Sequence, residues 1–370
     1  MKVFFDGNIF TSQKQGGISR VGFELMKNLN AFKDVEKIFY RGLYIDNYSF
    51  QSNWFKHYYG LRKPDTFNYR ALNLLDVMGM ELAYWANAST DVIFHSLFYR
   101  VPKNPKGPVV VHAYDMTHEL FGGGAKSIAF KKRAFEKADL IVAISQSTKR
   151  DLVRLYPQIH PNKVVVVYLG ISEAFLKPND FSGEVKSRPY VLYVGPRNYG
   201  YKNFELLLDV FIEKRYFLDF DLVVAGGEKE VELNQQEKIK MVTGRNSWFF
   251  HKFGSDQDLA RLYSKATALV YPSLYEGFGL PPLEAMASGC PVLASNASSI
   301  PEVVGDAGLL FDVNDKNDFT DKLGKILQDR QLQLMLKEKG HQRVGQFTWQ
   351  KMADAMHLEY QKLVKKDRVN

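Results

Sequence analysis

Cysteine is the scarcest residue of this chain, which holds only Cys290 among 370 residues. No disulfide can form within the chain, and we expect it to work in a reducing compartment. Cys290 stands between a helical pattern and the apolar run that starts at Pro291. This position predicts a buried packing residue and not a nucleophile.

Long hydrophobic runs are also absent. No apolar stretch approaches the roughly 18 residues that a membrane-spanning helix needs. The segment Met1–Asp6 predicts a short strand, and no apolar signal-peptide core follows it. We therefore expect a cytoplasmic protein that is soluble or contacts a membrane only peripherally.

Basic residues outnumber acidic ones, with 49 Lys and Arg against 41 Asp and Glu. The excess lies in the first half, because residues 1–175 hold 23 basic and 15 acidic residues and the remainder holds 26 of each. In the segment 126–137, cations alternate at helical spacing with apolar residues, namely Ile128, Ala129, Phe130 and Phe135. The segment is either an amphipathic surface for anionic lipid or a lipid diphosphate, or a solvated helix with its apolar side in the core. No aromatic and basic module of a nucleic-acid-binding type is present, so nucleic acid is not an expected partner.

Short β-rich apolar runs alternate with helical patterns along the whole chain, which predicts doubly wound α/β architecture. The length suggests two domains. In the first half we expect strands over residues 3–6, 38–44, 92–95, 109–114, 140–144 and 164–168, and helices over 18–29, 127–137 and 146–156, the last capped by Ser145. The aromatic segment 46–85 predicts no clear order of elements.

The alternation stops around Gly170–Pro189, where Gly, Pro, Asn, Asp and Ser gather, and this segment is the expected linker. A second alternation follows, with strands over 190–194, 222–225, 248–251, 268–271 and 292–294 and helices over 204–211, 256–264, 281–288 and 315–345. The segment 347–362 predicts a terminal amphipathic helix.

The segment Tyr271–Gly289 carries the most specific pattern. Gly277 and Gly279 allow backbone conformations in which amide N–H groups crowd together, and two prolines then suit the first turn of a helix. The free N–H groups and the positive helix end favour phosphate. Glu276 and Glu284 flank this turn, so the ligand must also offer hydroxyl groups. A nucleotide-sugar meets both requirements.

The E-x7-E pair Glu276 and Glu284, together with the run Pro291–Gly308, resembles the retaining glycosyltransferases of family 4. The resemblance is to bacterial hexosyl- and mannosyltransferases of surface polysaccharides. It implies a GT-B fold, in which two Rossmann-like domains face a cleft. The implied division is an acceptor-binding domain over 1–175, a nucleotide-sugar-binding domain over 176–345, and a helix in 346–370 that returns to the first domain.

The resemblance implies a donor site in the second domain. Arg197 and Lys202 follow its first strand, at the place where the family holds the donor diphosphate, and they can stabilise charge on the leaving phosphate. Glu276 is expected to orient the sugar hydroxyls and Glu284 the ribose. The remaining donor contacts are expected at Phe278, Gly279 and Leu280. The nucleobase pocket is expected near residues 251–254.

In the first domain, Gly16 and Gly17 open a helix and resemble the family's glycine loop, which approaches the donor phosphate. Arg20, one turn on, contacts either phosphate or a carboxylate.

The family often has His-Asp at the end of the strand over 109–114, but here Tyr114 takes the place of that histidine. We expect Asp115 and His118 to line the catalytic site, with Tyr114 a packing or acceptor contact. His112 shares the strand face of Tyr114.

These residues predict a retaining transferase that moves a hexose, with mannose from GDP-mannose first, onto a glycan or polyprenyl-diphosphate-linked acceptor. The alternatives are a UDP-sugar-dependent glucosyl-, galactosyl- or N-acetylhexosaminyltransferase, an epimerase or phosphorylase on the same fold, and an inactive carbohydrate-binding partner. We expect no cofactor and no metal: the Asp-x-Asp strings at 219–221 and 256–258 lie at a strand entry and a helix start. We also expect peripheral contact of the basic first domain with the cytoplasmic face of an inner membrane.

Overall fold

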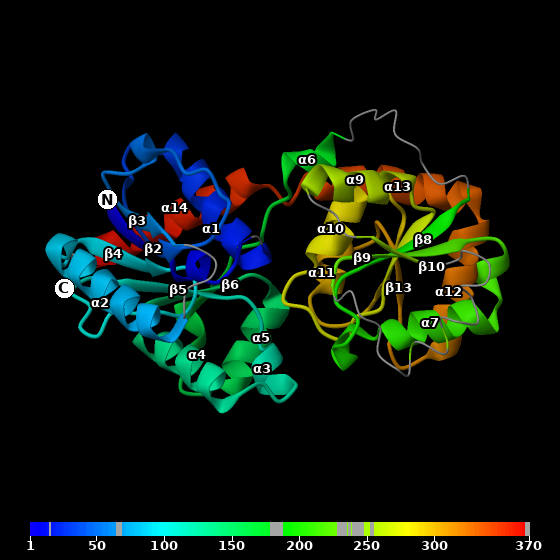
Figure 1. Ribbon diagram of the computed structural model, residues 1–370, viewed down its shortest axis with the longest axis horizontal. Coiled ribbons are helices and arrows are strands. Elements are labelled where there is room, and N and C mark those ends of the chain that lie inside the picture. The colour runs from blue at the N-terminus through cyan, green and yellow to red at the C-terminus, as the bar shows by residue number, and fades with distance from the viewer. Residues whose placement is uncertain are drawn as a thin grey trace. The chain divides into compact units, whose positions relative to one another are not determined.

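The computed structural model describes residues 1–14, 16–63, 69–177, 188–227, 235, 238, 248–251 and 255–366, with the backbone alone for 69–73, 248–251 and 366. The chain divides into two compact units. The first unit comprises Met1–Gly170 with Trp349–Asn370, and the second comprises Ile171–Thr348 (Figure 1). Each unit is described by itself.

The described residues of the first unit form a seven-stranded parallel sheet in the order β3-β2-β1-β4-β5-β6-β7. The strands are β1 (Lys2–Asp6), β2 (Glu36–Tyr44), β3 (His57–Arg62), β4 (Val92–Ser96), β5 (Val109–Ala113), β6 (Leu140–Ala143) and β7 (Val164–Val166). Most of their residues are buried, as expected for strands that helices cover on both faces. Every strand that the sequence predicts in this half is present, with shifts of one or two residues at the ends.

Two helices from opposite parts of the chain pack on opposite faces of this sheet. The helices of the unit are α1 (Gly17–Asn28), α2 (Tyr69–Asn87), α3 (Thr117–Leu120), α4 (Ala125–Lys137), α5 (Gln146–Leu155) and α14 (Trp349–Lys366). Tyr84 of α2 contacts the rings of Phe4 and Phe94 on one face. Tyr360 of α14 meets His95 on the other face, because neighbouring residues of a strand point to opposite sides. The predicted return of the terminal helix to the first unit is confirmed, and α14 lies beside α1 (Figure 1).

The segment 46–85, for which the sequence predicts no order, contains β3 and the long helix α2. Helix α2 escapes sequence reasoning because its apolar residues do not gather on one side. Both its buried and its exposed sides carry large hydrophobic residues, so the pattern has no clean period.

The described residues of the second unit form a six-stranded parallel sheet in the order β10-β9-β8-β11-β12-β13. Its strands are β8 (Tyr190–Val194), β9 (Asp221–Ala225), β10 (Trp248–His251), β11 (Ala268–Tyr271), β12 (Val292–Ser295) and β13 (Leu309–Phe311). Its helices are α6 (Glu173–Leu176), α7 (Phe204–Glu213), α9 (Asp256–Lys265), α10 (Leu280–Ala287), α11 (Ile300–Val304), α12 (Lys316–Gln328) and α13 (Arg330–Val344). The sequence misses α6, α11 and β13, which are too short to show a period.

The core of the second unit joins the sheet to α7 and α12. Phe204 and Phe211 of α7 and Phe319 of α12 are fully buried in one cluster with strand residues. Helices α9 and α10 contact each other and α6 apart from this cluster. The unit boundary at Gly170 falls where the predicted linker begins, while residues 178–187 of that linker lie outside the described part.

Both sheets share one strand order, in which the first strand of the unit lies in the middle beside the fourth. The chain leaves these two neighbours toward opposite edges. In sheets of this kind, ligands bind next to the loops that follow these two strands, at the carboxyl ends of the strands. In the first unit these loops follow β1 and β4, and in the second they follow β8 and β11.

Candidate functional site

In the second unit, the loops after β8 and β11 contain five of the residues that the sequence predicts for donor binding. The loop after β8 holds Arg197 and Lys202, and the loop after β11 holds Glu276, Phe278 and Gly279. The two loops are joined directly, since the N–H of Leu274 donates to the carbonyl of Tyr201 at 2.7 Å. The sheet topology thus brings together side chains that lie about 75 residues apart in sequence.

A lysine and a tyrosine converge on the carboxylate of Glu276. Lys202 Nζ donates to Glu276 Oε1 at 2.7 Å, and the hydroxyl of Tyr271 donates to the same oxygen at 2.6 Å. Burial, and then the neighbouring Glu276, raises the pKa of Tyr271 well above its usual value, so this hydroxyl keeps its proton. Both donors use Oε1, which leaves Oε2 as the oxygen that neither of them occupies.

Two serines hold the backbone of the same turn. Ser298 and Ser299 donate from their hydroxyls to the carbonyl of Glu276 at 2.6 and 2.8 Å. Ser299 also contacts the carbonyl of Phe278 at 2.7 Å. These residues belong to the run Pro291–Gly308 that carries the family resemblance, and this positioning role was not apparent from the sequence.

Helix α10 begins directly after this turn. Gly279 precedes it with φ 117°, a conformation that strongly favours glycine, and proline occupies the first helical turn. The amide groups at 278–280 therefore meet the N-terminal end of an eight-residue helix. Glu284, one turn further on, is buried and accepts a hydrogen bond from Tyr263 at 3.1 Å.

Arg197 is buried just after the end of β8. Gly195 directly follows the strand and has φ 136°. A side chain at the neighbouring Gly227 would come within 2.7 Å of the Gly195 carbonyl and of Pro196. Two glycines thus let the loops after β8 and β9 approach closely. In the predicted nucleobase pocket, only the backbone of His251 is described, and residues 252–254 lie outside the described part.

In the first unit, Gly16 and Gly17 begin α1 after β1, as predicted. Gly16 has extended backbone, and a side chain there would come within 2.5 Å of the Gln13 amide oxygen. That oxygen accepts from the N–H of Ser19 at 3.3 Å. Arg20, half-buried, lies near Glu24, whose pKa it lowers against the larger opposing effect of burial. Arg20 thus acts electrostatically on a carboxylate, and its contact with phosphate stays a prediction.

The strand end at 112–118 separates its two histidines. His112 is fully buried, and burial lowers its pKa to about 3. His118 is exposed on α3. Asp115 is half-exposed, accepts from the N–H of Thr117 at 2.9 Å and lies 3.5 Å from the Lys131 ammonium. Of the two histidines, only His118 is thus open to a solute.

Tyr114 is a packing residue. It is buried, its hydroxyl donates to the carbonyl of Leu97 at 2.8 Å, and its ring stacks on His112 at 5.6 Å. Of the two expected roles the structure shows the packing one, and the acceptor contact stays a prediction.

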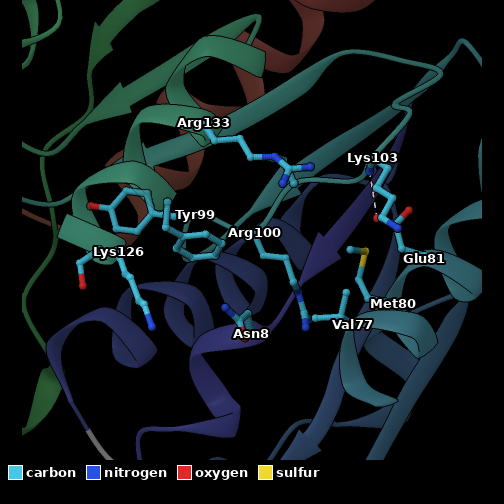
Figure 2. Close-up of a pocket in the computed structure, with 12 residues that line it drawn as sticks. Asn8, Val77, Met80, Glu81, Tyr99, Arg100, Lys103, Lys126 and Arg133 are labelled. Carbon is cyan, nitrogen blue, oxygen red and sulfur yellow. Dashed lines mark hydrogen bonds between the residues drawn. The ribbon is translucent and has the colours of Figure 1, made fainter. Parts of the chain in front are cut away.

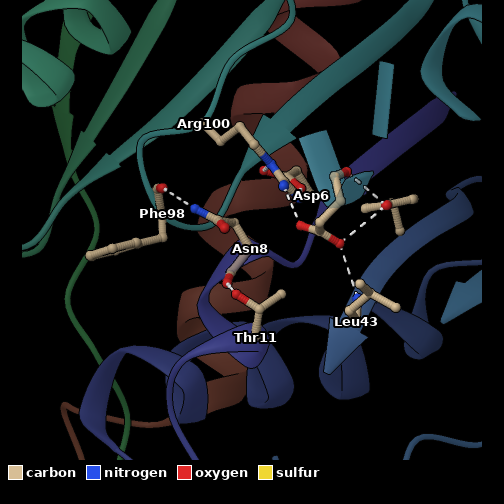
Figure 3. A network of polar contacts seen from close by, with 8 residues as sticks. Asp6, Asn8, Thr11, Leu43, Phe98 and Arg100 are labelled. Atoms are coloured by element: carbon tan, nitrogen blue, oxygen red, sulfur yellow. Dashed lines mark hydrogen bonds and ion pairs between the residues drawn. The ribbon is translucent and has the colours of Figure 1, made fainter. Parts of the chain in front are cut away.

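A buried ion-pair network occupies the switch point of the first sheet, and sequence reasoning missed it. Arg100, after β4, binds the carboxylates of Asp6 at the end of β1 and Asp76 of α2 (Figure 3). Asp76 also accepts from the N–H of Leu43 at 3.0 Å and from the hydroxyl of Tyr40. The network ties β1, β2, α2 and the loop after β4 together.

Beside this network, a pocket with a volume of about 480 Å³ opens between α2, α4 and the segment after β4 (Figure 2). Its lining includes the cations Lys103, Lys126 and Arg133, and the acidic residue Glu81. Glu81 accepts from the N–H of Lys103 at 2.9 Å.

Helix α4, which carries five of the basic residues of the first half, matches neither sequence interpretation fully. Phe135 is buried as expected of an apolar side, but Phe130 is 40% exposed. The buried cation is Lys131, which binds Glu119 at 3.1 Å. The predicted apolar side of the helix is therefore divided between the core and the pocket.

Three further observations bear on the sequence predictions. Cys290 is buried, and burial raises its pKa to about 12, which confirms a packing role. Among the described residues, no helix is both long and apolar enough to cross a membrane. In the same part of the chain, no cluster of three His, Cys, Asp or Glu residues is placed to hold a metal ion.

Two family models match this chain. The model described as Glycosyltransferase Family 4 covers residues 16–175, and the model described as Glycosyl transferases group 1 covers residues 177–343. Together they account for most of the chain. The chain belongs to family 4 of the glycosyltransferases. The predicted family is thus confirmed, and the two matches divide between Phe175 and Lys177.

Relatives and solved structures agree with this assignment. O-antigen chain mannosyltransferase B of Escherichia coli is 32% identical over 232 residues, which cover 59% of this chain and 59% of that protein, less than two thirds of its length. Among solved structures, sucrose-phosphate synthase from Thermosynechococcus elongatus has a TM-score of 0.76 at 20% identity, with 99% of both chains covered. WaaG, a glycosyltransferase involved in lipopolysaccharide biosynthesis, has a TM-score of 0.69 at 16% identity, with 96% of this chain and 98% of that chain covered. These structural likenesses show the fold, which is GT-B as predicted.

Proposed function

We propose that the protein is a retaining hexosyltransferase that uses a nucleotide diphosphate sugar, with GDP-mannose as the first donor to test. The observation that carries this proposal is the convergence of Lys202 and Tyr271 on Glu276, directly before the helix turn at Gly279. One side of this arrangement offers positive charge and amide groups to a diphosphate. The other side offers a carboxylate to sugar hydroxyls. Few ligands other than a nucleotide-sugar need both.

The choice of mannose rests on the likeness to the Escherichia coli O-antigen mannosyltransferase. By the same likeness we propose that the acceptor is a glycan, free or linked to polyprenyl diphosphate, in the synthesis of a surface polysaccharide. We also propose that the basic first unit contacts the cytoplasmic face of a membrane peripherally. A donor with UDP in place of GDP is the alternative that the experiment below distinguishes.

The chemistry follows from the charges around the leaving group. In a retaining transfer, the bond between sugar C1 and the phosphate oxygen breaks, and the bond between C1 and the acceptor oxygen forms on the same face. The proton of the acceptor hydroxyl passes to the leaving phosphate. Arg197, Lys202 and the amides at 278–280 stabilise the charge that grows on that phosphate, an effect larger in the transition state than in the ground state.

Glu276 holds the sugar in this proposal. Oε1 is already bound to Lys202 and Tyr271, so Oε2 is available to accept from a sugar hydroxyl. Glu284 is proposed to bind the ribose, and Asp115 and His118 to line the acceptor side. Because cations already face the diphosphate, the proposal needs no divalent metal.

The test is binding and turnover with a panel of GDP- and UDP-sugars in the presence of EDTA. Thermal shift and saturation-transfer NMR identify the donor, and the anomeric configuration of the product reports retention or inversion. Binding of one donor at micromolar strength without metal, followed by transfer with retention, supports the proposal. The proposal is contradicted if no nucleotide-sugar of the panel binds, or if the protein converts the donor to an epimer without an acceptor.

A further inference from the structure

Helix α2 carries a row of large apolar side chains that face solvent. Their exposed fractions lie between 54% and 71%, for Leu74, Leu75, Met78, Leu82 and Trp85. Positions 74, 78, 82 and 85 follow steps of four, four and three, which place them on one side of a helix. The row carries no charged residue. Contiguous exposed apolar surface of this kind usually marks an interaction site.

The row is not needed to hold α2 on the sheet. A different side of the helix does that, with Met80, Ala83 and Tyr84 buried against the core. Asp76 adds its ion pair with Arg100 at 2.5 Å. The helix is therefore fixed in place while it presents a second apolar face outward.

Cations border this row. Val77, Met80 and Glu81 of α2 line the pocket whose other rim is formed by Lys103, Lys126 and Arg133 (Figure 2). Glu81 lies seven residues after Leu74 and four before Trp85, which places it on the helix beside these two residues. Because Glu81 also lines the pocket, the pocket borders the edge of the row. The three cations are exposed, whereas the fourth cation of the lining, Arg100, is bound to two carboxylates.

We propose that the apolar row of α2 and the cationic pocket beside it form one docking surface for a bilayer that contains anionic lipid. The helix lies in the plane of the interface with Leu82 and Trp85 among the acyl chains, and Lys103, Lys126 and Arg133 meet headgroup phosphates. This inference rests on the membrane contact named in the proposed function and specifies its surface. The insertion is made by α2, and α4 supplies charge only.

Charge favours a bilayer over a second copy of the chain. A symmetric dimer places a patch against itself, so the three cations of one copy would lie close to those of the other. A surface of anionic headgroups neutralises them instead. Residues 1–175 as a whole also carry an excess of positive charge, which favours an anionic bilayer in the same way.

Co-sedimentation of the full chain with vesicles tests the proposal. Vesicles of phosphatidylcholine alone are compared with vesicles of phosphatidylcholine and phosphatidylglycerol, at low and high salt. We expect binding to the anionic vesicles only, weakened by salt. Leu82→Ser with Trp85→Ser reduces the affinity roughly tenfold or more, because apolar area is no longer buried. Leu358→Ser, at a leucine of α14 that is 56% exposed, leaves the affinity unchanged.

Helix α4 offers both test residues and a control for the role of the cations. Lys126→Ala and Arg133→Ala each weaken binding about fivefold, the effect of one cation near an anionic surface. Lys132→Ala changes it little, because Lys132 lies outside the pocket lining, 3.7 Å from Glu136.

Equal binding to neutral and anionic vesicles, or binding that survives the α2 variants, overturns the proposal. So does a dimer in solution that the α2 variants dissociate, since the row would then cover a second copy. Nucleotide-sugar binding is measured on the same samples. If the protein binds the donor but not the vesicles, only the proposed docking surface is rejected. If it binds the vesicles but not the donor, only the proposed transferase function is rejected.

Discussion

At the scale of single residues, the proposed donor site depends on which partners a carboxylate meets. Glu276 and Glu284 are equivalent in the sequence pattern, yet their surroundings differ. Glu276 is 13% exposed and bound to a cation, while Glu284 is almost fully buried against a tyrosine. A carboxylate that keeps one accessible oxygen next to a lysine can hold a sugar hydroxyl beside a phosphate.

Glu276→Gln is expected to lower kcat/KM by about 10²–10³-fold, the loss typical of removing one fixed charged contact to the transition state. Folding survives, because Tyr271 and Lys202 can still donate to the amide oxygen. Steady-state transfer assays and thermal melts check both points. Glu173→Gln, at an exposed carboxylate of α6, is the control. Unchanged turnover in Glu276→Gln would remove this residue from the site.

His112 makes the stability of the first unit depend on pH. It is buried and stacked on His95, and among the described residues neither of its ring nitrogens has a hydrogen-bond partner. Its folded pKa of about 3 lies below the usual 6.5, so the unfolded chain binds the proton more readily. The neutral imidazole contributes full stability above pH 6.5, and this is lost as the pH falls toward 3.

His112→Phe therefore reduces the acid sensitivity of folding. The slope of unfolding free energy against pH between 6 and 4 is expected to fall by about 1.4 kcal/mol per pH unit, the contribution of one proton. Urea titrations at several pH values measure it. His118→Phe, at the exposed histidine, leaves the slope as it is. The same slope in both variants would show that His112 titrates normally.

At the scale of elements, the turn before α10 combines a positive φ with the start of a helix. Gly279 has room for a methyl group, since a Cβ there would lie 3.8 Å from Val303. Its φ of 117° is the constraint, because side chains disfavour that region. The backbone geometry of this turn sets the direction in which the N–H groups of residues 278–280 point.

Gly279→Ala is expected to destabilise the second unit by about 1–2 kcal/mol through backbone strain, or to relax the turn and weaken donor binding by roughly tenfold or more. Chemical denaturation and donor titration together detect either result. Gly345→Ala, at a glycine with φ −58°, is the control and is expected to be neutral or slightly stabilising. If Gly279→Ala behaves like Gly345→Ala, the strain argument fails.

At the scale of the whole molecule, the two units have separate cores and separate switch points. The network of Arg100 with Asp6 and Asp76 belongs to the first unit alone, and the cluster around Glu276 belongs to the second. A change in one unit is therefore expected to leave the other unit's own stability intact.

Asp76→Ala leaves part of the Arg100 charge and the N–H of Leu43 without their acceptor, while the Tyr40 hydroxyl keeps its bond to the carbonyl of residue 76. The loss is expected to be about 3–5 kcal/mol, as for a broken buried ion pair. Differential scanning calorimetry should show the transition of the first unit at lower temperature, with nucleotide-sugar binding by the second unit retained below it. Asp91→Ala, at an exposed carboxylate of the same unit, should change the transition temperature little. A single transition that moves as a whole would show that the units unfold together.

Much of the fold could be predicted from periodicity, because strands covered on both faces are short apolar runs and helices between them show a clear period. Predictions failed where the period is hidden: α2 is apolar on two sides, and α11 and β13 are too short. The residues of the proposed donor site could be named from the sequence because they form two local motifs. The network of Asp6, Asp76 and Arg100 could not, since its members are far apart and each is unremarkable alone.

The sequence by itself determined the family, the α/β class and the residues around Glu276, because helix turns, glycine conformations and strand patterns are local properties. Tertiary structure decided the rest. It brought Lys202 to Glu276 across about 74 residues, buried His112 and Tyr114 while leaving His118 exposed, and turned the apolar row of α2 outward. These outcomes depend on which strands become neighbours and which helix face meets the sheet, and packing of the whole unit settles both.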